Sequence, residues 1–320
     1  MTYFARLFDL MVQVMLPLGL LVAAGGVWPV LFKDVHVEAV RTELNRIVLY
    51  LFYPCIMFAV AATTPVTWNL LTVPLLNGIG ALLSALVLYW LLYRSALCRD
   101  LSDSTRAILM LGGMFGNTFN VGVPVLVFFY GPDAPRYAVF NDMLMSVPLI
   151  WSLGVWICTR LGSHRRETDQ PAVWRIMASM PPLWAFVLGV AYQQLGIQYQ
   201  PAITAANFIG QATIPTILFV LGMTIPWRTL TPRREILAVS AVKLIVAPLL
   251  TWALAQALFA PLDEAQYAAV IEASTPAFVT LLVLASRFRL DSASAALLIG
   301  WSTILFWITL PLLMAAGLVR

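Results

Sequence analysis

The sequence predicts an all-α polytopic membrane protein with ten transmembrane helices, arranged as two inverted five-helix repeats whose fourth and ninth helices are broken. Three observations lead to this prediction. The 320-residue chain is 61% hydrophobic and only 11% charged, whereas soluble domains carry about 25% charged residues. Connections rich in basic residues alternate with connections that have almost none. Two apolar runs are interrupted near their middle by glycine, proline and polar residues.

The apolar runs are long enough to cross a membrane, for which about 20 residues are needed. The first run is longer than the apolar core of a signal peptide, which favours a membrane helix over a cleaved leader. Two pairs of adjacent runs are hard to separate, so nine or eleven spans are alternatives. The expected limits are 7–31, 45–62, 70–93, 106–130, 137–160, 177–195, 202–226, 235–258, 267–286 and 292–316.

Basic residues predict the orientation of these spans and favour ten of them. Among the even-numbered connections, only the fourth holds a basic residue, Arg136. By the positive-inside rule the odd-numbered connections are cytoplasmic, so both termini are expected outside. The odd-numbered connections carry Lys33, Arg41, Arg46, Arg94, Arg99, Arg106, Arg160, Arg165, Arg166, Arg175, Arg228, Arg233, Arg234, Arg287 and Arg289.

The most polar connection divides the chain into two halves. We expect a first repeat at 1–160, a cytoplasmic linker at 161–176 and a second repeat at 177–320. Five spans in each half force the second half to enter the membrane in the opposite orientation, as in many secondary transporters. The repeat is also visible in the residues, because Y-P-C-I-M-F at 53–58 resembles I-P-T-I-L-F at 214–219.

The two interrupted runs occupy matching positions in the two halves. Gly112–Gly131 carries glycines, a proline, two asparagines and a threonine, and Glu272–Thr280 carries a proline and hydroxyl residues. Backbone that leaves the helical pattern inside a membrane must be buried in protein or line a wet cavity. The alternative is that these residues only kink the helices or ease their packing.

A helix that begins at such a break has unpaired N–H groups and a partial positive charge at its end. Two such ends that meet at the membrane midplane can hold an anion. We therefore expect a small organic anion to bind there, oriented by side-chain hydrogen bonds and approached closely at glycine. The expected substrate-binding residues are Asn117, Thr118, Asn120, Gly122, Pro124, Thr275, Pro276 and Thr280.

Three ionisable residues within the spans are candidates for coupling or charge compensation. Lys243 can neutralise an anionic substrate or pair with an acid, and the alternative is a lysine that snorkels to the interface. Asp142 and Glu272 can carry a proton or bind a cation, and the alternative is a water-facing acid in an outer vestibule. The coupling ion, H⁺ or Na⁺, stays open.

No catalytic residue, metal site, cofactor or nucleic-acid partner is expected. Cys55, Cys98 and Cys158 lack paired spacing, and both histidines, His36 and His164, lie in connections. The sequence has neither an HExxH nor a GxSxG motif, which disfavours an intramembrane enzyme. A membrane sensor that binds a ligand without moving it is a further alternative.

Three stretches resemble the auxin efflux carrier family. They are G-N-T-F-N-V-G-V-P-V at 116–125, P-C-I-M-F at 54–58, and A-S-T-P with L-A-S-R-F within 273–288. The resemblance runs through nearly the whole chain in order. It is closest to the compact bacterial type, which includes proteins described as malonate or other organic-acid transporters, because the long cytoplasmic loop of many plant carriers is absent. The bacterial type implies a protein of the bacterial inner membrane, with both expected outer termini in the periplasm.

The resemblance implies a fold and a mechanism. It implies the bile acid–sodium symporter fold, with a scaffold of spans 1, 2, 6 and 7 through which two copies can form a homodimer. Spans 3–5 and 8–10 would form a mobile transport domain, in which Asn117–Pro124 and Pro276–Thr280 cross. The implied function is secondary active transport of a small organic anion, such as malonate or an auxin-like acid, by elevator-like alternating access. The alternative within the class is a sodium-coupled symporter of the bile-acid type.

Overall fold

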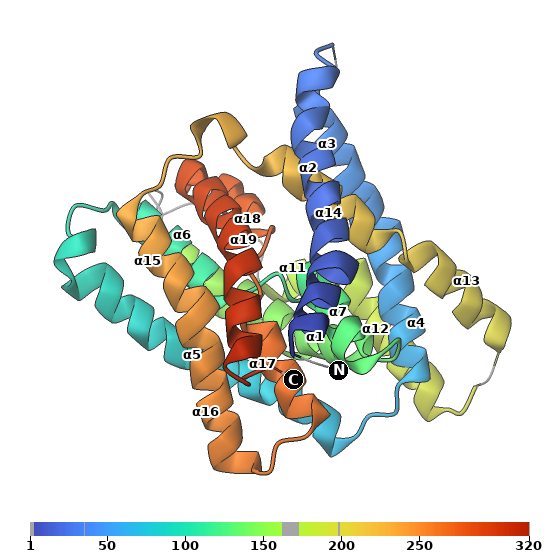
Figure 1. Ribbon diagram of the computed structural model, residues 1–320. Helices are drawn as coiled ribbons and strands as arrows, with labels where there is room; N and C mark the ends of the chain where they lie inside the picture. The colour runs from blue at the N-terminus through green and yellow to red at the C-terminus, as the bar shows by residue number, and fades with distance from the viewer. Residues whose placement is uncertain (1–2, 35, 162–172, 198, 320) are drawn as a thin grey trace.

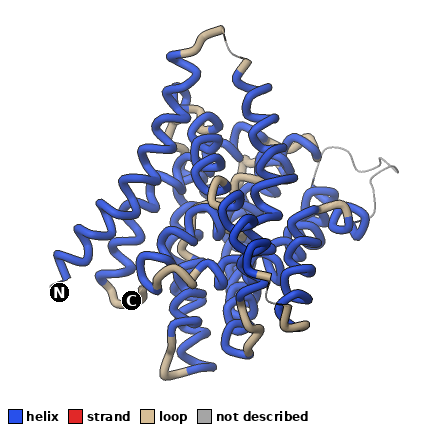
Figure 2. The backbone as a smooth tube through the Cα atoms, turned by 90° about the vertical axis from the view of Figure 1, so that its right-hand side faces the viewer, coloured by secondary structure: helices blue, strands red, loops and turns tan. Residues whose placement is uncertain are grey.

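The computed structural model describes residues 3–34, 36–161, 173–197 and 199–319, and every regular element within them is a helix (Figures 1 and 2). The linker predicted at 161–176, with His164, falls largely outside these residues. The two chain ends lie at the same end of the molecule (Figure 1). The turn after α2 (Leu16–Leu31) and the connection from α14 (Thr213–Thr224) to α15 (Arg234–Ala241) lie at the opposite end.

The helical elements follow one another with short connections. In residues 3–161 they are α1 (Tyr3–Leu10), η1 (Met11–Met15), α2 (Leu16–Leu31), α3 (Val37–Ile47), η2 (Val48–Phe52), α4 (Tyr53–Thr63), α5 (Trp68–Arg94), η3 (Ala96–Cys98), α6 (Asp103–Met114), η4 (Thr118–Gly122), α7 (Val123–Tyr130), α8 (Pro135–Asn141), η5 (Asp142–Ser146), α9 (Val147–Leu149), η6 (Ile150–Gly154) and α10 (Val155–Leu161). In residues 173–319 they are α11 (Val173–Ala178), α12 (Pro181–Gln194), α13 (Gln200–Gly210), α14 (Thr213–Thr224), η7 (Trp227–Thr229), α15 (Arg234–Ala241), η8 (Val242–Val246), α16 (Ala247–Phe259), α17 (Glu264–Ala273), α18 (Leu281–Arg287) and α19 (Ser292–Ala315).

Many of these elements join end to end into longer helices. Each of the long helices corresponds to one predicted apolar run, and its ends lie within two residues of the predicted limits except at the start of the second helix. That helix begins earlier than predicted, at Val37, because polar first turns continue the same helix. Within the part of the chain that the structure describes, seven helices are long and apolar enough to cross a membrane: Ala5–Leu31, Val37–Thr63, Trp68–Arg94, Pro135–Leu161, Gln200–Thr224, Arg234–Phe259 and Ser292–Ala315.

The other three predicted runs are not single long helices. In the fourth run α6 ends at Met114 and a second apolar helix, Thr118–Tyr130, follows. In the ninth run α17 ends at Ala273 and α18 begins at Leu281. The sixth run holds the short helix α11 and then α12. The fourth and ninth runs are therefore broken inside the segments in which the sequence predicts breaks.

Widened helical turns recur in the long helices, and prolines explain most of them. Among the described residues, five of the six π-helical turns end two residues before a proline. A proline has no N–H, and its ring collides with the carbonyl group four residues earlier, so a wider turn relieves the collision. These turns are η1, η2, η4, η5 and η8, and the prolines are Pro17, Pro54, Pro124, Pro148 and Pro248.

The helices pack as two groups that lie on opposite sides of Figure 1. In the first helix group, α2 packs on α14, and α4 packs on α12 and α13. In the second helix group, α5 packs on α6, α16 and α17, and α15 packs on α19. An apolar groove of about 540 Å³ runs between α2 and α14 of the first group and α19 of the second, and Val121 also lines it.

Glycines bring the backbones of the first helix group into direct contact. A Cβ atom at Gly25 would fall on the Phe219 carbonyl group, and one at Gly210 would lie 2.7 Å from the Ile56 nitrogen. A Cβ atom at Gly189 would lie 2.7 Å from the Phe58 carbonyl oxygen. Small residues of this kind let membrane helices approach closely, so the first group is a tightly packed unit.

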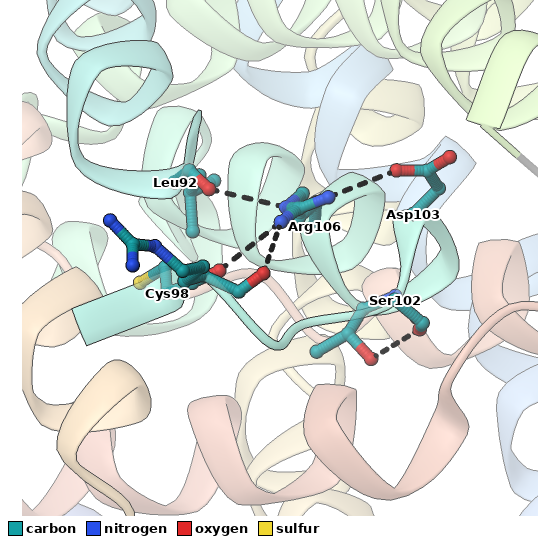
Figure 3. Close-up of polar contacts among 7 residues, drawn as sticks. Leu92, Cys98, Ser102, Asp103 and Arg106 are labelled. Carbon is teal, nitrogen blue, oxygen red and sulfur yellow. Dashed lines mark hydrogen bonds and ion pairs between the residues drawn. The ribbon is translucent and has the colours of Figure 1, made fainter. Parts of the chain in front are cut away.

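The turn between α5 and α6 is held by an arginine (Figure 3). Arg106 donates hydrogen bonds to the carbonyl oxygens of Leu92 at 3.2 Å and Cys98 at 3.2 Å, and it pairs with Asp103 at 3.2 Å. The Ser102 hydroxyl accepts a hydrogen bond from the backbone N–H of Thr105 and caps α6. Arg106, one of the arginines from which the cytoplasmic side is predicted, thus also binds a carbonyl group in the last turn of α5.

Asp291 caps α19 and ties it to α6, and we expect a pH-dependent effect of its removal. Its carboxylate accepts hydrogen bonds from the Ser294 N–H at 3.0 Å, the Ser294 hydroxyl at 2.6 Å and the Thr105 hydroxyl at 2.8 Å. Partial burial alone raises the pKa of Asp291, but these hydrogen bonds and the charge of Arg233 outweigh it, so the pKa lies below its usual value.

A depressed carboxyl pKa stabilises the folded state above the unfolded-state value of about 4, and this stabilisation is lost as the pH falls through the lower folded-state pKa. Asp291→Ala is therefore expected to lower the free energy of unfolding by about 1–2 kcal/mol at neutral pH and by less near pH 3. Thermal unfolding in detergent micelles across this pH range measures the difference. An equal loss at both pH values would show that the cap does not depend on the charge of Asp291.

Candidate functional site

The two interrupted segments meet at their interruptions. Gly116 and Ala277 form an antiparallel bridge, and the Asn117 N–H donates to the Pro276 carbonyl oxygen at 2.7 Å. The backbone groups that leave the helical pattern thus pair with each other, away from lipid. In the second interrupted segment, the Ala277 N–H donates a hydrogen bond to the Ser302 hydroxyl of α19 at 3.1 Å.

Gly116 is required at the crossing because no side chain fits there. A Cβ atom would collide with the Thr275 hydroxyl and would lie 3.1 Å from Lys243 Nζ. Thr275 and Lys243 are both buried. The glycine therefore admits two polar side chains to the break in the fourth predicted span.

Two asparagines lie where the second half of that span begins. Asn117 is the N-cap residue of the helix Thr118–Tyr130, and its side-chain oxygen accepts a hydrogen bond from Asn120 Nδ2 at 2.7 Å. Asn117 is buried, and its Nδ2 group has no hydrogen-bond partner among the described residues. A buried donor without an acceptor is costly, so a water molecule or a ligand that accepts a hydrogen bond would be stabilised at this amide.

The break is shorter than the predicted crossing segment Asn117–Pro124. The backbone leaves the helix only at Phe115–Asn117, and Gly122 and Pro124 lie inside a continuous helix. Pro124 does not interrupt this helix, because it stands in its first α-helical turn after the widened turn η4. Gly122 does not break the helix either. Its missing side chain leaves space for the Glu272 carboxyl group, since a Cβ atom at Gly122 would lie 2.6 Å from Glu272 Oε1.

The three candidate residues of the ninth predicted span differ from one another in burial. Thr275 is fully buried, and its hydroxyl donates to the Glu272 carbonyl oxygen at 2.7 Å. Pro276 is buried and provides the carbonyl oxygen that Asn117 contacts. Thr280 is exposed at the start of α18, so the structure does not bring it together with the buried polar groups of the crossing.

Asp142 is buried beside the crossing rather than in an outer vestibule. One carboxylate oxygen accepts a hydrogen bond from the Tyr53 hydroxyl at 2.7 Å, and the other accepts one from the Thr118 hydroxyl. Tyr53 lies on α4 of the first helix group, and its ring meets Phe119 edge-on with a centroid distance of 5.0 Å. Sequence reasoning missed Tyr53, although its position directly before Pro54 marks the end of a widened turn.

Glu272 and Lys243 are also buried, so neither the vestibule nor the snorkelling alternative describes them. Lys243 is 2% exposed, and its ammonium group donates to the Ala273 carbonyl oxygen, at the end of α17, at 2.5 Å. Glu272 is 0% exposed, and neither of its carboxyl oxygens has a hydrogen-bond partner in the described part of the chain. Both side chains line a cavity of about 20 Å³, which has room for one water molecule.

Comparisons with known proteins agree with the family suggested by the motifs. The chain matches the membrane transport protein family over residues 10–314. It is 28% identical to an uncharacterized transporter of Methanothermobacter thermautotrophicus over 279 residues, which cover 86% of this chain and 88% of the relative. It is 25% identical to an uncharacterized transporter of Methanocaldococcus jannaschii over 274 residues, which cover 82% and 83% of the two chains.

A match of this length, together with the apolar helices and the crossing of two interrupted segments, identifies a multi-pass membrane protein of a transporter family. The motifs at 116–125, 54–58 and 273–288 predict the same assignment. The chain belongs to the membrane transport protein family, which is the auxin efflux carrier family that its motifs predict.

Proposed function

We propose that this protein is a secondary active transporter of a small organic anion, which binds where the two interrupted segments cross. The observation that carries the proposal is the buried, unpartnered Nδ2 group of Asn117 at the start of the helix Thr118–Tyr130. A carboxylate is an acceptor that fits this donor. The partial positive charge of a helix N-terminus favours the same anion.

The other proposed binding residues complete the surroundings of this anion. Thr118, Asn120 and Gly122 follow Asn117 on η4, and Pro124 begins the α-helix beyond it. From the opposite segment come Thr275, Pro276 and Thr280, the last at the start of α18. Malonate and auxin-like acids are the substrate classes that the family resemblance suggests, and both carry a carboxylate.

We propose that the chain crosses the membrane ten times, as two inverted five-helix repeats. Seven long helices and the three interrupted or short stretches support this count. The position of both termini at one end supports an even number of spans (Figure 1). The basic connections favour a cytoplasmic linker and periplasmic termini in an inner membrane. The homodimer stays a prediction from the family resemblance.

The division into two moving parts is also a proposal. The first helix group would be the scaffold, because its helices are in backbone contact at Gly25, Gly189 and Gly210. The second helix group, with the crossing, would move as the transport domain. The apolar groove between α2 and α19 supports an elevator-like displacement, since apolar surfaces can slide there without breaking many polar contacts.

Asn117→Ala is expected to lower the transport rate by about 10- to 100-fold, because a hydrogen bond to a charged group contributes about 1.5–3 kcal/mol. Purified protein would first be screened by thermal shift against mono- and dicarboxylates, since a ligand of the folded state raises its apparent stability. Uptake of a radiolabelled ligand from this screen, with malonate as the first probe, is then measured in proteoliposomes.

The matched control is Asn45→Ala, which removes an exposed asparagine side chain on α3 and is expected to leave uptake unchanged. Uptake by Asn117→Ala at the wild-type rate would show that the anion binds elsewhere. Binding of the ligand without any uptake by the wild-type protein would favour a membrane sensor over a transporter.

A further inference from the structure

We propose that Glu272 is the proton-binding residue of the transport cycle, so that the anion and one proton move together. This inference rests on the proposed function. It names the coupling ion and assigns different protonation states to the two buried acids beside the crossing. It starts from the charges that the structure buries in this region.

Three ionisable side chains are buried together beside the crossing: Asp142 on η5, Lys243 on η8 and Glu272 on α17. The charged groups close enough to act on Glu272 are Lys243 and Asp142, and Tyr53 approaches from α4. Farther along α17, Glu264 is paired with Arg136 and Tyr137. The charge balance at Glu272 is therefore set by one cation and one other carboxyl group.

Hydrogen bonding decides which of the two acids is ionised. Both oxygens of Asp142 accept hydrogen bonds from hydroxyl groups, those of Tyr53 and Thr118, and this arrangement stabilises a carboxylate. Neither oxygen of Glu272 has a partner, and no ion pair within 4.0 Å joins it to Lys243 in the described structure. A buried carboxylate without hydrogen bonds costs several kcal/mol, which protonation removes.

The net charge of these three side chains is zero when Glu272 carries a proton, Asp142 is ionised and Lys243 is positively charged. If Glu272 were ionised as well, one negative charge would remain uncompensated in a buried region. If Lys243 lost its proton instead, its ammonium contact with the Ala273 carbonyl oxygen would weaken, and the cation that balances the acids would be lost. The neutral arrangement with protonated Glu272 is thus the favoured one.

The same geometry couples the proton to the substrate. Gly122 brings Glu272 against the helix that begins with Asn117, and Gly116 brings Lys243 against the break. An anion at Asn117 adds a negative charge, which an ionised Glu272 repels and a protonated Glu272 does not. By linkage, anion binding favours proton binding to Glu272, and proton binding favours the anion equally.

Space for a water molecule lies next to the carboxyl group of Glu272. The cavity of about 20 Å³ that Glu272 lines has room for one water molecule and is also lined by Asn77, Ser84 and Thr251. The Asn77 Nδ2 and Ser84 hydroxyl groups have no hydrogen-bond partner among the residues that the structure describes. The proton would arrive from water at one side of the membrane, bind a Glu272 oxygen, and return to water at the other side, with no further reactant.

The transport test uses the full chain in proteoliposomes, with radiolabelled malonate as the probe and the membrane potential clamped at zero. For one proton per anion, a pH gradient of one unit is expected to drive accumulation of about tenfold, because one pH unit equals about 1.4 kcal/mol per proton. A sodium gradient at equal pH is expected to drive none. Accumulation that follows sodium and not the pH gradient would overturn the proposal.

Two substitutions at one position separate the proton site from the anion site. Glu272→Gln is expected to lose accumulation driven by the pH gradient while it still exchanges labelled for unlabelled malonate. Glu272→Asp keeps a proton-binding carboxyl group and is expected to recover part of the accumulation. Accumulation by Glu272→Gln equal to that of the wild type would overturn the proposal. The absence of malonate exchange in the wild-type protein would count instead against the proposed function with this probe.

Infrared spectroscopy tests the proton site without any substrate. The purified protein should show the carbonyl stretch of a protonated carboxylic acid, shifted in D₂O, and Glu272→Gln should lose this band. Asp142→Asn should keep it, because Asp142 is the ionised acid. A band that persists in Glu272→Gln and disappears in Asp142→Asn would assign the proton to Asp142 and would overturn the proposal, whatever the substrate is.

Discussion

Gly222→Ala is expected to lower the free energy of unfolding by about 2–3 kcal/mol, although alanine is the better helix former. Gly222 lies on α14 where it crosses α2, and a Cβ atom there would collide with the Val22 carbonyl oxygen and would lie 2.9 Å from the Gly26 nitrogen. These neighbours are backbone atoms of another helix and cannot turn aside. The two helices must separate to admit the methyl group, which loses contacts along the whole crossing.

A second glycine in a helix provides the control. A Cβ atom at Gly78 of α5 would make only an ordinary contact, 3.4 Å from Met145 Cγ, so Gly78→Ala is expected to leave stability unchanged or slightly higher. Both variants are compared with the wild type by thermal unfolding in the same detergent. If Gly222→Ala unfolded at the wild-type temperature, the close approach of α2 and α14 would not hold in the protein.

Gly116→Ala is expected to lower the transport rate by about 100-fold or more. Gly116 does not have a positive φ, so alanine is compatible with the backbone and the effect is steric. The new methyl group would displace the Thr275 hydroxyl and the Lys243 ammonium group, and Lys243 would lose its 2.5 Å contact with the Ala273 carbonyl oxygen. Both broken segments would then shift, and a displacement of about 1 Å at a binding site can cost 100-fold in rate.

Transport of Gly116→Ala must be compared at equal amounts of folded protein, measured by gel filtration and thermal unfolding. Gly154→Ala is the matched control, because a Cβ atom at Gly154 would lie 3.5 Å from Leu111 Cδ2 and needs no movement. It is expected to transport at the wild-type rate. Uptake by Gly116→Ala within about twofold of the wild type, with the crossing intact, would mean that Lys243 and Thr275 do not need their present positions.

The helices could be predicted closely from the sequence, because a membrane requires long apolar segments and tolerates few charges in them. The predicted limits 70–93 and 292–316 lie within two residues of α5 and α19. The start of the second long helix could not be predicted, because the polar residues from Val37 onward belong to a helix that extends beyond the apolar run. Apolar content indicates where lipid begins, and helical structure can continue past that point.

The interruptions could be located, but the roles of their residues could not. Glycines, prolines and asparagines at 112–131 indicate a break, yet the non-helical backbone comprises only Phe115–Asn117. Pro124 lies within a helix because η4 widens to accommodate it, and Thr280 is exposed. A local pattern cannot distinguish a proline that ends a helix from one that widens it, since the difference depends on what packs beside it.

The sequence by itself determined a polytopic helical protein of a transporter family with two interrupted spans, because hydropathy, basic connections and short motifs are local properties of the chain. Only the tertiary structure decided what surrounds the three buried ionisable side chains. In the described structure, Asp142 accepts hydrogen bonds from Tyr53 and Thr118, and Lys243 donates one to the end of α17. The carboxyl group of Glu272 has no hydrogen-bond partner there. These contacts link residues far apart in the chain, and the state of a buried charge depends on such neighbours rather than on adjacent residues.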